Sequence, residues 1–262
     1  MKAIIMAAGV GSRLKNINGD RPKCLIEIDG ESLISRSVSL LQCKGITDIC
    51  VITGYKSELI HHELQSRVTY LHNPYFRVTN SIASLWLARD ILCDDVILMN
   101  ADLYYEEAVL DTAIAQTGRA VMLSDLTKIE DADFRFCVRG NRILKTGNKL
   151  SIQDTDCEYV GIVRVDKTFI AAFRDRLEKM ISSGDFRNWW EGVLYACIDD
   201  GIDIFHQDVE GAFWSEVDNL GDYDRLLNWI SSQTVKATPL VPFGDISEGV
   251  PQVVSMKLAA NE

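Results

Sequence analysis

The sequence predicts an α/β protein built around a doubly wound, mostly parallel sheet. Residues 2–8 form a continuously apolar run, as expected of a strand that is buried on both faces. Short β-branched runs then alternate with helical patterns along the first half of the chain. This alternation is typical of parallel strands joined by right-handed helical crossovers, the arrangement of a Rossmann-like sheet.

The individual elements follow from local periodicity and from turn residues at their ends. Besides residues 2–8, we expect strands at residues 49–53, 68–70, 95–103 and 120–125. Helical patterns lie between them at residues 33–43, 58–65, 81–91 and 106–116.

The pattern changes at about residue 134 to shorter strands followed by two helices. The expected strands are 134–138, 142–145 and 159–165, and the helices are 167–182 and 188–198. We interpret residues 134–200 as a small embedded α+β lobe that packs on the sheet and carries side chains for a second ligand. A strand at 202–207, a short run at 214–217 and an amphipathic helix at 221–231 follow.

The end of the chain has a different composition from the rest. Residues 233–262 hold three of the five prolines and show no convincing period, which is typical of a linker. We therefore predict one folded domain over residues 1–232 and a tail whose removal beyond about residue 232 would leave the fold nearly unchanged.

Charge and cysteine content limit the classes of function. Lys and Arg number 27 against 38 Asp and Glu, so the net charge of −11 repels nucleic acid and anionic membranes. The seven scattered cysteines lack a C-x-x-C pair, as expected of reduced thiols. The first apolar run is too short for a signal peptide, and no run is long enough to span a membrane. These observations predict a cytoplasmic protein.

The most informative segment follows the first strand. Residues 6–14 read MAAGVGSRL, and Arg21-Pro22-Lys23 comes soon after. Glycines allow backbone amides to approach phosphate oxygens, and the cations supply charge. Leu14 stands where a G-x-G-x-x-G motif needs its third glycine, and a Walker A motif does not fit either. The alternative is a tight strand-to-helix turn with two solvated cations.

This segment resembles the AAGxGxRL…PK signature of the nucleotidyltransferase superfamily, which activates sugar phosphates and small alcohol phosphates. The resemblance covers roughly residues 1–232. It implies that Arg13 and Lys23 are catalytic, with Arg13 on the leaving pyrophosphate and Lys23 on the α-phosphate or the incoming phosphoryl group. It also implies a nucleotide-binding loop made of Ala7, Ala8, Gly9, Gly11, Ser12 and Arg13.

Two aspartates are candidate ligands for Mg²⁺, which nucleotidyl transfer requires and which prefers hard oxygen donors. Asp102 ends an apolar strand, at the edge of the sheet where ligands bind. The resembled family carries its first metal aspartate there and its second before the last helix, which matches Asp218, with Glu216 as a neighbour that could be confused with it. The alternative for each aspartate is a helix or turn cap.

A polar stretch at residues 79–85 begins a predicted helix. It resembles the Asn/Ser-rich stretch of phosphocholine and aminoalkylphosphonate cytidylyltransferases, which favours CTP and makes Asn80, Ser81 and Ser84 candidate nucleotide-binding residues. Helix capping alone could also explain these side chains.

Aromatic and acidic residues in the lobe point to a cationic acceptor. The segments Cys157-Glu158-Tyr159-Val160-Gly161 and Trp189-Trp190-Glu191 combine ring faces with carboxylates, which together attract an ammonium group. From them we select Glu158, Trp189, Trp190 and Glu191 as acceptor-binding residues. The alternative is that the tryptophans belong to the core and the glutamate to a solvated helix face.

The last residues, 256–262, resemble the opening of histidinol-phosphate-aminotransferase-like pyridoxal phosphate enzymes. A proline-containing linker before them would suit a fusion to such a domain. Separately, the protein could form a homodimer. Residues after 262 of the source gene would settle the fusion hypothesis.

The combined prediction is a Mg²⁺-dependent cytidylyltransferase that joins CTP to a small phosphate or phosphonate bearing a cationic nitrogen and releases pyrophosphate. A sugar-1-phosphate nucleotidyltransferase is the alternative among enzymes. A non-catalytic nucleotide-binding regulatory module is disfavoured because loop, cations and both aspartates are present together. An NAD-dependent oxidoreductase is disfavoured by the missing third glycine.

Overall fold

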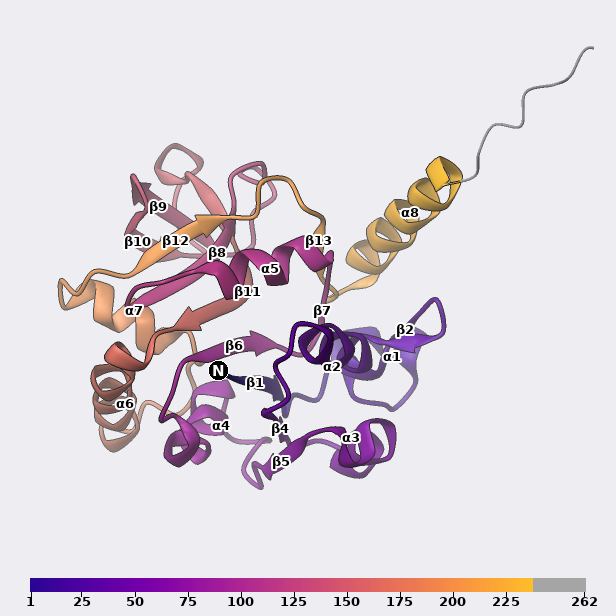
Figure 1. The fold of residues 1–262 in the computed structure, drawn as a ribbon, viewed down its shortest axis with the longest axis horizontal. Coiled ribbons are helices and arrows are strands. Elements are labelled where there is room, and N and C mark those ends of the chain that lie inside the picture. Colours follow the sequence, from indigo (N-terminus) through magenta and orange to yellow (C-terminus); the bar gives the residue numbers. More distant parts are fainter. Residues whose placement is uncertain (238–262) are drawn as a thin grey trace, which may run out of the picture.

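A nine-stranded sheet forms the centre of the molecule (Figure 1). The computed structural model describes residues 1–237, and within them it leaves out the side chains of Ser12, Lys15 and 234–237. The strand order is β5-β4-β1-β6-β11-β8-β12-β10-β9. The strands are β1 (Lys2–Ala7), β4 (Ile49–Thr53), β5 (Thr69–His72), β6 (Val96–Asn100), β8 (Ala120–Asp125), β9 (Arg135–Arg139), β10 (Arg142–Gly147), β11 (Cys157–Val165) and β12 (Phe205–Asp208).

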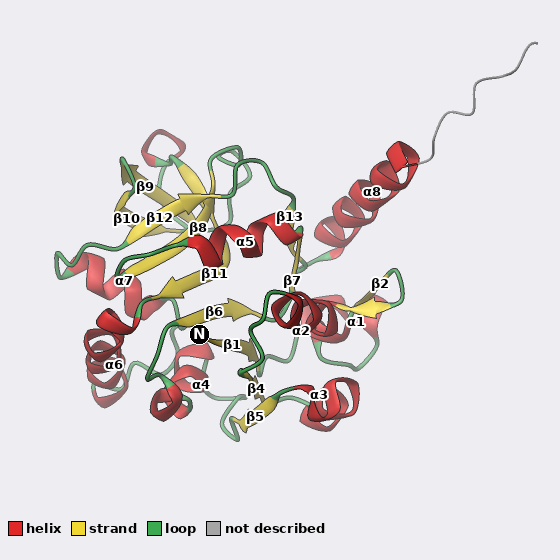
Figure 2. Ribbon diagram, in the orientation of Figure 1, coloured by secondary structure: helices red, strands yellow, loops and turns green. Residues whose placement is uncertain are grey.

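Helices cover both faces of this sheet (Figure 2). On one face pack α4 (Ser81–Leu87), α6 (Lys167–Ser182) and α7 (Gly192–Asp199), and on the other pack α2 (Leu33–Cys43), α3 (Ser57–Leu64) and α5 (Glu107–Ala115). Each face of the sheet packs in its own cluster of buried apolar side chains. In strand β1, Ile4 and Met6 belong to the cluster on one face, and Ala3 and Ile5 belong to the cluster on the other. Alternating side chains need two apolar layers, so the α/β doubly wound prediction is confirmed.

Residues 134–200 extend the main sheet and do not form a separate layer on it. Strands β4, β1 and β6 are parallel to one another, and β12 is parallel to β8. Strand β11 lies between β6 and β8 and is antiparallel to both. The predicted acceptor lobe is therefore continuous with the nucleotide-binding part, and one strand borders both.

Two small pairings complete the fold. A hairpin joins β2 (Glu27–Ile28) to β3 (Glu31–Ser32), and β7 (Leu103–Tyr105) pairs with β13 (Trp214–Glu216). The short helix α1 covers Lys15–Asn18, and 3-10 turns lie at Ser12–Leu14 and Lys23–Leu25. All seven cysteines are free thiols. In the described part of the chain, no helix combines the length and apolarity needed to cross a bilayer.

Helix α8 (Leu220–Ala237) extends away from the sheet (Figure 1). It continues five residues past the predicted domain boundary at 232, so that boundary is corrected; the rest of the predicted linker lies outside the described residues. Leu226 is fully buried in a third cluster with Leu14 and Val217. The Trp229 ring stacks on Phe213 with centroids 4.0 Å apart.

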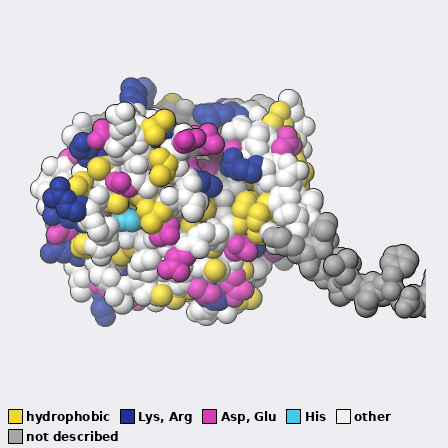
Figure 3. All heavy atoms as spheres, turned by 90° about the horizontal axis from the view of Figure 1, so that it is seen from above, with side chains coloured by type: hydrophobic (Ala, Val, Ile, Leu, Met, Phe, Trp, Pro, Cys, Tyr) yellow, Lys and Arg dark blue, Asp and Glu magenta, His cyan; other side chains and the backbone are white. Residues whose placement is uncertain are grey.

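The face of the molecule in Figure 3 has intermixed acidic and basic side chains, and on its described part no broad basic area is visible. That distribution agrees with the excess of Asp and Glu in the sequence. A long polyanion would find no continuous cationic surface there.

Replacing Trp229 by alanine should lower the free energy of unfolding by about 2 kcal/mol, because the ring is half-buried against Phe213 and Tyr104. For a chain of this size that corresponds to a Tm lower by roughly 4–8 °C in a thermal melt. The control is Ile152→Ala, which truncates an exposed side chain. Equal Tm values for the two variants would show that α8 is not anchored by this stack.

Candidate active site

The loop after β1 brings two cations together. Gly11 has a positive φ of 62°, and a Cβ atom on it would lie 2.6 Å from the Cβ of Lys23. Only glycine permits this approach, whereas a Cβ on Gly9 would meet nothing within 4 Å. The two glycines of the motif therefore have different roles. Gly11 lets Lys23 pack against the loop, and Gly9 leaves open space beside the loop, in the pocket.

Three carboxylates gather opposite this loop. The apolar run at residues 95–103 is not one strand but breaks after Asn100 into β6 and β7, which places Asp102 in the turn. Strand β13 pairs with β7, and the Val217 amide donates to the Asp102 carbonyl oxygen at 3.0 Å. This pairing brings one oxygen each of Asp102, Glu216 and Asp218 within 4.8 Å of one another.

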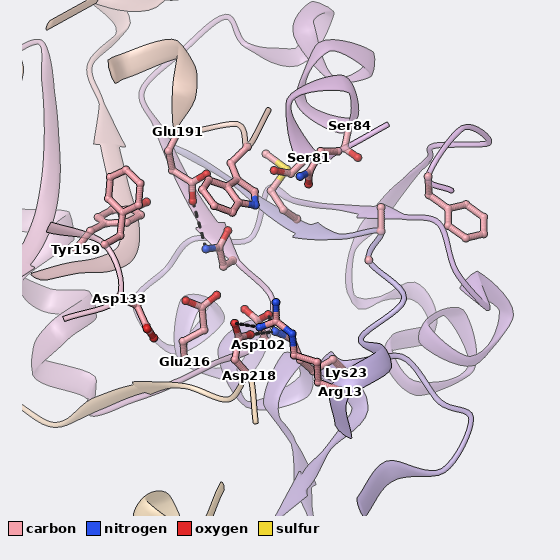
Figure 4. Close-up of a pocket in the computed structure, with 18 of the residues that line it drawn as sticks. Arg13, Lys23, Ser81, Ser84, Asp102, Asp133, Tyr159, Glu191, Glu216 and Asp218 are labelled. Carbon is pink, nitrogen blue, oxygen red and sulfur yellow. Dashed lines mark hydrogen bonds and ion pairs between the residues drawn. The ribbon is translucent and has the colours of Figure 1, made fainter. Parts of the chain in front are cut away.

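Lys23 lies between two of these carboxylates (Figure 4). Its ammonium forms ion pairs with Asp102 and Asp218, and Arg13 Nη1 lies 3.6 Å from Asp218 Oδ2. Burial alone would lower the pKa of Lys23, but the charges of Asp102 and Asp218 more than offset it and raise the pKa. Lys23 is therefore a permanent cation at this point, while the Arg13 side chain is 76% exposed and free to reach a ligand.

Glu216 has a raised pKa. Burial, together with the charges of Asp102 and Asp218, raises its pKa well above the ordinary value. The Oδ1 atom of Asp102 is buried and has no hydrogen-bond partner among the described residues. Hard oxygens close together, one of them unpartnered, fit a Mg²⁺ ion, which Asp102 and Asp218 would hold with Glu216 beside them.

These groups line one end of a pocket of about 530 Å³. The N-terminal end of α4 lines another side through Asn80, Ser81 and Ser84. Asn80 is the N-cap, and its Oδ1 accepts the Ser81 amide at 2.8 Å. Ser81 Oγ accepts the Trp190 amide at 2.9 Å, and Ser84 Oγ accepts from Asn73 at 3.0 Å. Capping and packing thus account for part of this polar stretch.

The far end of the pocket carries Glu191, a buried carboxylate. Asn100 donates to Glu191 Oε1 at 3.3 Å and accepts the Trp190 indole N–H at 2.8 Å. Burial raises the pKa of Glu191 to about 7, with a contribution from the charge of Asp102. Near neutral pH this carboxyl can therefore exist in either protonation state.

Aromatic rings surround Glu191. Trp189 is 53% exposed and stands edge-on to Phe134, and Phe134 stacks on Tyr195 with centroids 4.7 Å apart. Tyr159 on β11 also lines this end, whereas Asp133 lines the pocket on the side of Glu216 (Figure 4). Figure 4 shows Tyr159 and Glu191 on the side of the pocket away from Arg13 and Lys23.

Several predicted site residues occupy different places from those expected. Trp190 is fully buried in the core and contacts pocket residues through its hydrogen bonds to Asn100 and Ser81. It precedes α7 in a turn, where neighbouring side chains diverge, so Trp189 enters the pocket and Trp190 does not. Both were predicted to bind the acceptor, and for Trp190 the structure corrects this.

Glu158 is also corrected. Its Oε1 accepts the Asp133 amide at 2.7 Å, and its Oε2 lies 4.0 Å from Lys128, so it supports the loop and does not line the pocket. Successive residues of a strand face opposite sides, and Tyr159 is the one that faces the ligand. Ala7 and Gly11 lie behind the pocket wall, and the side chain of Ser12 is not described.

Sequence reasoning did not select twelve of the residues that line the pocket. Among them are Asn100, Asp133, Phe134, Tyr159 and Tyr195, and Glu216 was expected only as a neighbour of Asp218. Tyr159 belonged to the segment that was selected for its aromatic and acidic character. No sequence signal distinguishes Asp133 or Tyr195 from ordinary loop and helix residues.

The α/β sheet, the glycine loop with its two cations, and the facing carboxylates form a site suited to the phosphates of a nucleotide and a divalent cation. Comparison with known proteins agrees. Residues 3–128 match the model of the MobA-like NTP transferase domain. The chain is 25% identical to a CTP:phosphoglutamine cytidylyltransferase of Campylobacter jejuni, over 86% of this chain and 98% of that relative.

Two further proteins are similar to this chain. A CMP-5'-(3-aminopropyl)phosphonate synthase of Streptomyces rubellomurinus is 26% identical over 85% of this chain and 37% of that longer relative. The solved CTP:phosphocholine cytidylyltransferase of Streptococcus pneumoniae superimposes with a TM-score of 0.73 at 23% identity, covering 87% of this chain and 98% of the other. The superposition on this solved structure shows that the two proteins share a fold.

The carboxylate cluster can be tested directly with a paramagnetic ion. Asp102→Asn and Asp218→Asn should each weaken Mn²⁺ binding at least tenfold, since each loses an anionic oxygen ligand. Free Mn²⁺ can be followed by electron paramagnetic resonance, without any assay of activity. Asp203→Asn is the control, because Asp203 pairs with Arg142 at 2.8 Å on the surface. Unchanged affinity in both pocket variants would place the ion elsewhere.

Proposed function

We propose that this protein is a Mg²⁺-dependent cytidylyltransferase that transfers CMP from CTP to a small phosphate or phosphonate bearing a cationic nitrogen. The observation that carries the proposal is that the cationic side chains of the pocket lie at one end and a buried, ring-flanked carboxyl lies at the other. Arg13 and Lys23 are the cationic residues among its described lining, and both lie at the phosphate end. Glu191 and the aromatic rings lie at the other end.

A ligand that suits this pocket has an anionic group at one end and a cation at the other. A hexose 1-phosphate would satisfy the phosphate end, but its hydroxyls would leave the buried Glu191 carboxylate without a counter-charge. An ammonium group gains from both the carboxylate and the exposed ring of Trp189. The chemistry of this end therefore favours an amine-bearing acceptor.

The choice of CTP rests on the relatives and on the base-binding side of the pocket. Both curated relatives described above carry cytidine chemistry in their names. Ser81 and Asn80 offer small polar side chains beside the phosphate loop, as expected for recognition of a base edge by hydrogen bonds.

Catalysis would depend on position and charge, because the acceptor phosphoryl oxygen can attack the α-phosphorus of the nucleotide in line without a covalent enzyme intermediate. Lys23 would hold the α-phosphate, and the exposed Arg13 would hold the departing pyrophosphate. Asp102 and Asp218 would hold Mg²⁺, whose charge stabilises the phosphates. The pocket's rings would exclude water from the acceptor end.

A pyrophosphate-release assay tests the proposal. It compares CTP with other nucleoside triphosphates, each with phosphoethanolamine and with glucose 1-phosphate as the acceptor. CTP with phosphoethanolamine should exceed CTP with glucose 1-phosphate at least tenfold in kcat/KM, equivalent to about 1.4 kcal/mol. Glu191→Gln should reduce that preference while sparing the KM for CTP. Glu58→Gln, an exposed change on α3, is the control. Equal or higher activity with glucose 1-phosphate would assign the enzyme to the sugar-activating branch.

The raised pKa of Glu191 predicts a pH dependence of acceptor binding. A carboxyl with a pKa of about 7 is mostly protonated at pH 6 and mostly ionised at pH 8. Because a cation binds the ionised form, the KM of the acceptor should fall by up to roughly tenfold between these values. Glu191→Gln should lack this fall, and the acceptor's own titration affects both proteins equally. Identical pH profiles would contradict the assignment.

A further inference from the structure

One polar atom in the acceptor end of the pocket has no partner. Tyr159 is 8% exposed and lines the pocket, and its hydroxyl is buried without a hydrogen bond to any described residue. Buried hydroxyls are nearly always hydrogen-bonded, so an unpartnered one at a binding site needs an explanation. A ligand that donates a hydrogen bond to this oxygen, or accepts one from the hydroxyl, would be the missing partner.

The surroundings of Tyr159 favour a ligand that donates. The charged neighbour at this end is the buried carboxyl of Glu191, and a carboxylate accepts hydrogen bonds when it is ionised. The Asn100 bond to Glu191 is long at 3.3 Å. Lys and Arg are absent from this end of the described lining, so a positive charge to pair with Glu191 must come from the ligand.

The rings are poorly arranged for a fully methylated cation. A quaternary ammonium has no N–H group and is held by several ring faces around it. Here Phe134 and Tyr195 stack on each other at 4.7 Å with planes 12° apart, so each ring covers a face of the other. Trp189 meets Phe134 edge-on, at 88°. The stack therefore leaves Phe134 and Tyr195 with one free face each to offer a cation.

We propose that Tyr159, together with Glu191, selects acceptors whose cationic nitrogen carries N–H groups, namely primary aminoalkyl phosphates or phosphonates, over quaternary ammonium acceptors. This inference rests on the proposed function and makes its acceptor specific. Tyr159 is the specificity-determining residue: its oxygen accepts one N–H, and Glu191 accepts another. Methylation of the nitrogen removes these donors one at a time.

The test is a methylation series with CTP. Phosphoethanolamine, its N-methyl and N,N-dimethyl derivatives, and phosphocholine lose one N–H donor and gain one methyl group at each step, and 2-aminoethylphosphonate tests the phosphonate class. The kcat/KM should decrease along the series, at least tenfold from first to last, mainly through KM. Equal or higher kcat/KM with phosphocholine would overturn the inference and leave the proposed function in place. Pyrophosphate release with none of the five would overturn both.

Tyr159→Phe removes the oxygen alone and keeps the ring. The ratio of kcat/KM between phosphoethanolamine and phosphocholine should fall at least fivefold. The Tm should not decrease, because an unpartnered hydroxyl contributes no hydrogen bond to the fold. A structural role would instead lower the Tm and reduce activity with every acceptor alike, which would contradict the inference.

The matched control is Tyr105→Phe. Tyr105 is fully buried in the other core cluster, on β7, and does not line the pocket. Loss of the Tyr105 hydroxyl should not change the ratio of kcat/KM between phosphoethanolamine and phosphocholine. A change of the ratio equal to that of Tyr159→Phe would show that the effect is not local to the pocket.

Discussion

The site depends on one ammonium group placed between two carboxylates. Lys23, Asp102 and Asp218 come from three distant parts of the chain, and Glu216 adds a third carboxyl beside them. Without a cation, so many carboxylates in one place would repel one another and favour an open arrangement. Gly11 lets Lys23 approach the loop, and the pairing of β7 with β13 brings Asp102 and Asp218 together. Both features are needed for this arrangement of charges.

Local patterns predict most elements of the fold, and long-range pairing accounts for what they miss. The bounds expected for β4, β8, α2 and α6 coincide with those observed, because burial on one or two faces leaves a clear period in the sequence. The position of β11 is different. Its insertion between β6 and β8, antiparallel to both, is a choice among strand partners, which the residues of β11 alone do not specify.

The candidate site shows the same division. The glycine loop and Asp102 were predictable because a motif or a strand end marks them in the sequence. Of the four predicted acceptor residues, Trp189 and Glu191 line the pocket. Glu158 was chosen where its neighbour Tyr159 faces the pocket, and Trp190 is buried in the core. Strand β11 is buried on both faces, so its composition does not reveal which of two adjacent residues faces a cavity.

The placement of opposite charges at the two ends of one pocket also affects how a ligand arrives. Once Asp102 and Asp218 hold a divalent cation, that ion with Arg13 and Lys23 at one end and Glu191 at the other would create an electric field along the pocket axis. A zwitterion that approaches is turned by this field before it makes any contact, so its phosphate leads toward the loop. A molecule of uniform negative charge meets repulsion from the rest of the acidic surface. Orientation during entry would therefore weaken as added salt screens the field.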